Sequence, residues 1–221
     1  YALTLPIFND DDIIISSDLD EIPNPDAISQ VNDWITDDAH FTFQMNFYMY
    51  YLNNYMTDNW YGTRVATYKY LKGKTLDGIR ESTEEQSKIS GPIIDGGGWH
   101  FSYFGGEEMI KHKIASFSHT EHNNEETLSR ISDNVKNNVD LFGRNVSFEV
   151  VSIEDSEYPQ YIIDNQEKYS HLIKWSHMIF TELYKGQGLG NQLFVYVSTR
   201  AIAKKLNQPF GIKNPQNFKA P

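Results

Sequence analysis

Three carboxylates stand together near the start of the chain, directly after a run of β-branched residues. Residues 13–25 read IIISSDLDEIPNP, and the acids are Asp18, Asp20 and Glu21. Two acids spaced i, i+2 at the end of a buried strand place hard oxygen ligands where a sheet opens to solvent. Enzymes use such ligands to hold Mg²⁺ or Mn²⁺ against a diphosphate. We therefore expect Asp18 and Asp20 to bind a divalent metal in a nucleotide-sugar site.

An alternative is that these acids only cap the ends of a short strand, where charged residues are common. The residues that follow favour a functional loop. Asn24 and Pro25 supply the N-cap and the first residue of a helix. The apolar positions of that helix would be Ile28, Val31 and Ile35. The acids are then expected in a strand-to-helix loop, where open α/β sheets bind ligands.

A second informative segment is IIDGGGWHFSYFGGEEMIKHKIA, residues 93–115. Its three consecutive glycines let the backbone pass close to a ligand or turn sharply. Glu107 and Glu108 would lie in the first turn of the following helix, where the helix dipole lowers a carboxylate's pKa. Either acid would then be ionised and ready to accept a proton. The alternative is that both only stabilise the helix N-terminus.

Residues 40–52, HFTFQMNFYMYYL, alternate between two sets of side chains. Strict period two predicts a strand with one face buried in a core. The aromatic stripe is therefore expected in the core. Tyr48, Tyr50 and Trp60 are the residues that could line an acceptor groove instead.

Three segments of the chain, SDLDEIPNPDAI, GGGWHFSYFGGEE and YIIDNQEKYSHLI, follow one another in the order found in glycosyltransferase family 17. The chain resembles this family from about its start to residue 173. The resemblance implies a GT-A fold, a UDP-sugar donor, a divalent metal (Mn²⁺ or Mg²⁺) and inverting transfer. Some animal members of the family add N-acetylglucosamine to N-glycans, so UDP-N-acetylglucosamine and a glycan acceptor are the expected partners.

The resemblance also implies roles for single residues. Glu108 is the expected base for the acceptor hydroxyl, because many inverting GT-A enzymes place the base at the start of a helix after a glycine turn. His100 would complete the metal shell or contact the sugar, and is preferred to His119 because it lies in a matching segment. It could equally be a packed, hydrogen-bonded side chain. Arg80 is the basic residue that could face the diphosphate, although such residues are usually only solvated.

Composition narrows the choice of function. The net charge of −11 disfavours binding to nucleic acid. With no cysteine, the chain has no disulfide or thiolate site, which favours a cytoplasmic protein, with a Golgi lumen location as the alternative if a membrane anchor lies upstream. No apolar run is long enough to span a bilayer.

The expected architecture is α/β. Residues 1–175 would form a GT-A-like mixed sheet flanked by helices, lacking part of the N-terminal nucleotide-binding half, since little sequence precedes the acidic loop. Residues 176–221 would begin a second domain with a βα unit. There the string GQGLGNQLFVYVSTRAIA resembles the start of family 11 fucosyltransferases, which are GT-B enzymes. The alternative is a simple βα unit packed on the first domain.

We therefore expect an inverting, metal-dependent glycosyltransferase that uses UDP-N-acetylglucosamine. One rival is a non-catalytic carbohydrate-binding or scaffold module derived from such an enzyme. Another is a metal-dependent phosphohydrolase, which would need more ligands converging on two metals than the sequence offers.

Overall fold

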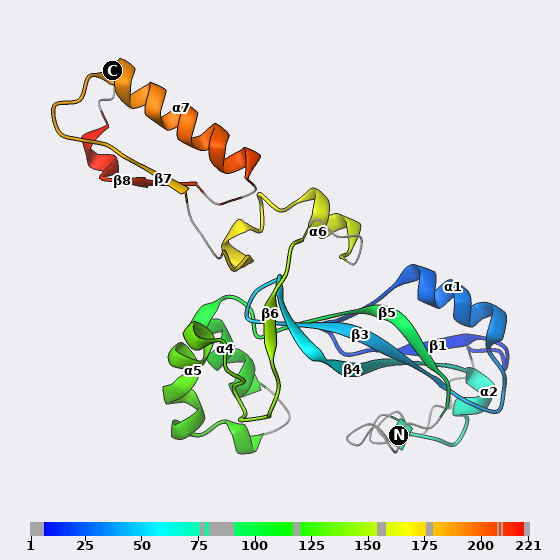
Figure 1. Ribbon diagram of the computed structural model, residues 1–221. Helices are drawn as coiled ribbons and strands as arrows, with labels where there is room; N and C mark the ends of the chain where they lie inside the picture. The colour runs from blue at the N-terminus through cyan, green and yellow to red at the C-terminus, as the bar shows by residue number, and fades with distance from the viewer. Residues whose placement is uncertain are drawn as a thin grey trace. The chain divides into compact units, whose positions relative to one another are not determined.

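Figure 1 shows the computed structural model of the chain. It describes residues 7–75, 78–79, 91–116, 120–153, 158–175, 179–206, 208 and 210–218. The chain divides into two compact units, Tyr1–Leu172 and Ile173–Pro221.

The first unit is built on one mixed sheet in the strand order β1-β4-β3-β5-β2, with β6 paired to β4. Among the strands described, β3 and β5 run parallel, and the other paired neighbours are antiparallel. The prediction of an α/β domain with a mixed sheet flanked by helices is confirmed. The strands are β1 (Ile13–Ser16), β2 (Glu21–Pro23), β3 (Phe41–Met49), β4 (Asn54–Thr67), β5 (Ile93–Ser102) and β6 (Phe148–Val150).

The sheet is curled, because a short loop joins its two outer strands. Residues 17–20 connect β1 to β2, which lie at opposite ends of the five-strand path. In a flat sheet those strands would lie about 19 Å apart. The five steps from Ser16 to Glu21 reach about 17 Å when fully extended, and a turn between Asp18 and Glu21 shortens them further. The acidic loop therefore crosses one face of a curled sheet.

The expected strand-to-helix loop is wrong in one respect: the acids lie between two strands. The three-residue strand β2 intervenes because its backbone pairs with β5, Glu21 opposite His100. The helix α1 (Pro25–Trp34) follows β2 and starts as predicted, since Asn24 Oδ1 accepts a hydrogen bond from the backbone N–H of Asp26 at 3.1 Å. Ile35 is the C-cap and lies just beyond the helix.

Helices cover the sheet in two places. Ala27 and Val31 of α1 pack in one hydrophobic cluster with Phe41, Phe43 and Met45 of β3. A second cluster joins Phe47 and Met49 of the same strand to the helices α4 and α5. Other helical segments among the described residues of this unit are α2 (Tyr68–Leu71), α4 (Gly106–Ser116), η3 (Thr120–His122), α5 (Glu125–Asn137), α6 (Gln160–Asp164) and η4 (Ser170–Leu172).

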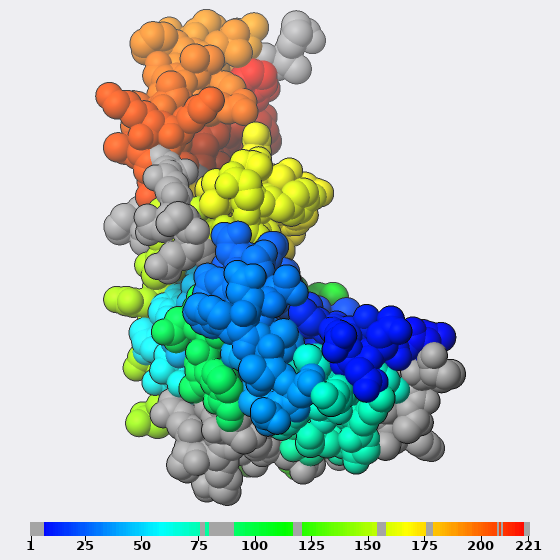
Figure 2. Space-filling view, turned by 90° about the vertical axis from the view of Figure 1, so that its right-hand side faces the viewer, coloured from blue at the N-terminus to red at the C-terminus, as the bar shows by residue number. Residues whose placement is uncertain are grey.

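Figure 2 shows the surface on which α1 and the residues after it lie beside α2, where Lys69 Nζ contacts Asp37 Oδ2 at 2.6 Å.

β3 is buried on more than the one face that the alternation predicts. Tyr48 is 1 % exposed, because the rings of Tyr55, Phe101 and Tyr158 pack around it. Tyr50 is also buried, and its hydroxyl donates to the carbonyl of Val139 at 2.6 Å. Both tyrosines are thus core residues. Of the two, Tyr50 also borders a pocket, which is described below.

The second unit contains β7 (Ile179–Glu182), α7 (Leu189–Lys205), β8 (Phe210–Lys213) and η5 (Pro215–Asn217). β7 and β8 are parallel, and α7 provides the crossover that parallel neighbours require. The strand, glycine loop and helix follow one another as the sequence predicts. Across the described part of the chain, no helix has both the length and the apolar character needed to cross a bilayer.

Candidate functional site

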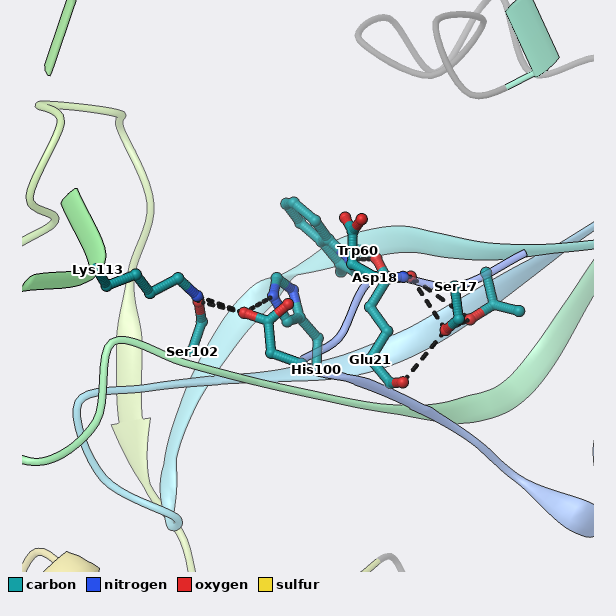
Figure 3. Close-up of polar contacts among 9 residues, drawn as sticks. Ser17, Asp18, Glu21, Trp60, His100, Ser102 and Lys113 are labelled. Atoms are coloured by element: carbon teal, nitrogen blue, oxygen red, sulfur yellow. Dashed lines mark hydrogen bonds and ion pairs between the residues drawn. The ribbon is translucent and has the colours of Figure 1, made fainter. Parts of the chain in front are cut away.

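The third acid of the loop, Glu21, points into the protein. Its side chain is 5 % exposed, and its carboxylate accepts hydrogen bonds from several neutral donors. Trp60 Nε1 donates to Oε1 at 3.0 Å, and the backbone N–H of Asp18 donates to Oε2 at 3.1 Å. The hydroxyls of Ser17 and Thr63 lie 3.5 Å from the same Oε2. Glu21 therefore fastens the start of the acidic loop to β4 (Figure 3).

Gly62 of β4 leaves the space that this buried carboxylate occupies. A Cβ atom at position 62 would lie 2.5 Å from Glu21 Oε1 and 2.6 Å from Met45 Sδ. Both distances are too short for any side chain without displacement. Trp60 and Gly62 thus give the Glu21 carboxylate a hydrogen-bond donor and the space that it needs.

Asp20 is the acid on which polar side chains from other elements converge. Its Oδ2 accepts a hydrogen bond from Ser102 Oγ at 2.9 Å, lies 3.2 Å from His100 Nε2 and pairs with Lys113 Nζ. Burial alone would raise the pKa of Asp20. The hydrogen bonds and charges of His100 and Lys113 together outweigh burial, and the pKa of Asp20 lies well below its ordinary value. Asp20 is therefore ionised at neutral pH, and its side chain is 27 % exposed.

His100 is held rigidly beside Asp20. It is 6 % exposed, stacks on Phe47 with ring centroids 4.3 Å apart and contacts the ring of Trp60 at 4.5 Å. Its Nε2 faces Asp20, while its buried Nδ1 has no hydrogen-bond partner among the described residues. His100 is thus both packed and adjacent to the candidate metal ligand.

Ser102 and Lys113 are the members of this cluster that the sequence analysis missed. Lys113 projects from α4 and donates to Ser102 Oγ at 2.6 Å (Figure 3). Its ammonium also lies over the ring of Tyr103, 4.5 Å from the ring centroid. Lysines on an amphipathic helix are usually solvated, so the residue type gives no signal. The one hint is position, because Lys113 borders the buried face formed by Ile110 and Ile114.

Glu108 lies in the first turn of α4, as predicted, but away from this cluster. Its side chain is 88 % exposed, and its Oε1 lies 3.4 Å from Lys111 Nζ, which is closer to Glu107 at 2.7 Å. Five residues separate Glu108 from Lys113, which turns the helix about 140° beyond a full turn. The two side chains therefore leave α4 in different directions. The structure does not bring Glu108 together with Asp20.

The remaining predicted residues are placed as follows. Asp18 is exposed at the loop and donates its backbone N–H to Glu21, whereas Asp20 has the partners given above. Within the described ranges, no three His, Asp or Glu side chains converge as a metal-binding group. Arg80 and His119 lie outside the described residues.

Two of the three consecutive glycines of β5, Gly97 and Gly98, make close protein contacts. A Cβ atom at Gly98, whose φ is +141°, would lie 2.2 Å from the carbonyl oxygen of Ile22, and one at Gly97 would lie 2.4 Å from Phe43 Cβ. These glycines therefore let β2 and β3 approach β5, which sets the position of the acidic loop.

A pocket of about 250 Å³ opens beside the N-terminus of α4. It adjoins the Asp20 cluster through the backbone, since the N–H of Tyr50 donates to the carbonyl of Ser102 at 3.1 Å. Two tyrosines, two glycines, a histidine and apolar residues line it, a set of residue types suited to a sugar ring. The lining residues are Tyr50, Tyr51, Gly105, Gly106, Ile110, Val135, His171 and Leu172.

The profile of glycosyltransferase family 17 matches residues 2–176. No curated protein and no solved structure matches the chain.

Proposed function

Because the chain belongs to glycosyltransferase family 17 and is therefore a glycosyltransferase, we propose that it transfers N-acetylglucosamine from UDP to a glycan acceptor. We further propose that the reaction is metal-dependent and inverting, on a sheet of the GT-A type. One observation carries most of the proposal. The acidic loop is fastened at Glu21 and at Asp20, so its carboxylates are held in fixed positions on the sheet.

The donor set suits a cation that is held mainly by a diphosphate. Mg²⁺ usually keeps several waters and binds through one or two carboxylates plus substrate phosphates, so a protein cage of three ligands is not needed. Asp18 is exposed, and the partners of Asp20 all contact Oδ2. The other carboxylate oxygen of Asp20, Oδ1, accepts no hydrogen bond from the described residues. Asp18 and Asp20 would hold the cation, which supplies positive charge for the departing diphosphate.

The chain's own residues position these ligands. Glu21 and Trp60 fix the start of the loop, and His100, Ser102 and Lys113 fix the orientation of the Asp20 carboxylate. A fixed carboxylate does not have to be ordered when the donor binds, which lowers the entropic cost of binding.

We propose Glu108 as the base that accepts the proton of the acceptor hydroxyl. In direct displacement the acceptor attacks from the side opposite the leaving group, so base and metal lie apart. The exposed carboxylate of Glu108 and the pocket beside Gly105 and Gly106 share the first turn of α4. We therefore place the acceptor sugar at this pocket.

Transfer from a panel of nucleotide sugars tests the proposal. We expect UDP-N-acetylglucosamine with Mn²⁺ to give an extended glycan product detectable by mass spectrometry, using mannose-containing N-glycans as acceptors. Glu108→Gln should lose transfer and keep UDP binding, with Glu107→Gln as the matched control on the same turn. Turnover of another donor, or a Glu108→Gln variant as active as Glu107→Gln, would contradict the assignments. Stabilisation by glycan without any response to UDP or Mn²⁺ would indicate a binding module.

A further inference from the structure

Lys113 places a positive charge on the carboxylate that is proposed to bind the metal. Its Nζ pairs with Asp20 Oδ2 and donates to Ser102 Oγ at 2.6 Å. The ammonium also lies 4.5 Å from the centroid of the Tyr103 ring, an arrangement that favours a cation. These three contacts hold the charge in place, and the Lys113 side chain is 33 % exposed.

Lys113 opposes the negative charge of the acidic loop without any ligand. Its ammonium pairs with Asp20, one of the two carboxylates proposed to hold the metal. The loop therefore attracts a divalent cation less strongly than it would without the charge of Lys113.

Lys111, the neighbouring lysine of α4, does not share this role. Its Nζ contacts Glu107 at 2.7 Å and Glu108 at 3.4 Å, and both acids lie in the first turn. The two lysines of α4 are therefore paired with different acids. This difference makes Lys111 a matched control for Lys113.

We propose that Lys113 couples cation binding to nucleotide binding, an inference that rests on the proposed metal role of Asp20. Lys113 opposes a free divalent cation at Asp20 by electrostatic repulsion. A nucleoside diphosphate brings two or more negative charges, which compensate for both Lys113 and the metal. The cation then binds well only together with the diphosphate, and Lys113 acts through Asp20 rather than on the sugar.

The size of the effect follows from charge and distance. A cation on the free oxygen of Asp20 would lie about 6 Å from the ammonium of Lys113. Even with the dielectric constant of water, repulsion at that distance weakens binding of a divalent cation about 10-fold. Removing the charge of Lys113 should therefore strengthen binding of the metal alone by at least about 10-fold.

Direct Mn²⁺ binding, followed by electron paramagnetic resonance of the free ion with and without UDP, tests this coupling. Lys113→Gln removes the charge and keeps a donor for Asp20 and Ser102, while Lys113→Met removes both. We expect either variant to bind Mn²⁺ alone about 10-fold more tightly than the unmodified chain, with a smaller gain from UDP. Lys113→Arg and Lys111→Gln should behave like the unmodified chain. UDP binding measured with and without Mn²⁺ must show the same coupling factor, because linkage is reciprocal.

The outcomes separate this inference from the proposed function. If Mn²⁺ affinity of Lys113→Gln is unchanged or weaker, while Asp20→Asn removes UDP-dependent Mn²⁺ binding, the coupling role of Lys113 is overturned and the metal role of Asp20 stands. If the unmodified chain binds no Mn²⁺ even with UDP, both are overturned. Urea unfolding of each variant shows whether it is folded, and a purely structural role for Lys113 would lower stability without changing the coupling factor.

Discussion

Replacing Glu21 by Gln gives the sharpest test of how the acidic loop is held. The side chain keeps its size, so Gly62 and Met45 still pack against it. The change removes the negative charge and turns one of the two acceptor oxygens into a donor. Trp60 Nε1 at 3.0 Å and the backbone N–H of Asp18 at 3.1 Å bind different oxygens of the carboxylate. One of these two donors must therefore face an NH₂ group, whichever way the amide is turned.

The cost can be worked from these contacts. A buried donor left without an acceptor costs about 1–3 kcal/mol. The remaining hydrogen bond loses its charge assistance, at a further cost of about 1 kcal/mol. Release of the buried charge of Glu21, which is 5 % exposed, offsets part of this. We expect a net destabilisation of about 2 kcal/mol, which lowers the melting temperature by roughly 4–8 °C for a unit of this size.

Urea unfolding monitored by tryptophan fluorescence measures the effect, because Trp60 reports on the same contact. Glu126→Gln is the matched control, since its exposed carboxylate pairs only with Arg130 on the surface of α5 within the described contacts. The control should change stability by less than about 0.5 kcal/mol. A Glu21→Gln variant as stable as the unmodified chain, or more stable, would refute the view that its donors require a charged acceptor.

Three further predictions concern the stability of the fold. Gly98→Ala should destabilise the chain by more than about 2 kcal/mol in urea unfolding, because its Cβ would lie 2.2 Å from the carbonyl oxygen of Ile22. Gly190→Ala, with open space around it, should be neutral or stabilising by up to about 1 kcal/mol. Burial, aided by nearby positive charges, lowers the pKa of His40 to about 4 from 6.5, so the folded state holds it neutral. The contribution of His40 to the free energy of unfolding is therefore complete above pH 6.5 and falls by about 1.4 kcal/mol per pH unit between pH 6.5 and pH 4. His40→Phe should remove this pH dependence.

Local features of the sequence predicted the elements that carry the site. Asn24 and Pro25 fixed the start of α1, since an N-cap and a first-turn proline act on adjacent residues. Glu107 and Glu108 were likewise expected in the first turn of a helix, and both lie in the first turn of α4. The strand β3 followed from its alternation, although burial of Tyr48 on the other face depends on distant rings.

The partners of the acids could not be predicted, because they come from distant parts of the chain. Glu21 is held by Trp60, and Asp20 by Ser102 and Lys113. These contacts depend on the curl of the sheet and on the position of α4, and neither leaves a local pattern in the sequence. The role of the β5 glycines could not be predicted from the sequence either, because Gly98 allows a close contact with another strand rather than with a ligand.

The central claim is that Asp18 and Asp20 hold a divalent cation against the diphosphate of a nucleotide sugar. Calorimetric titration of UDP with and without Mn²⁺ tests it most directly, on the unmodified chain and on Asp18→Asn and Asp20→Asn. The account predicts that UDP binds tightly only when Mn²⁺ is present and that the Asp20→Asn variant loses this dependence. UDP binding that ignores Mn²⁺, or that persists with Mn²⁺ in both variants, would contradict the account.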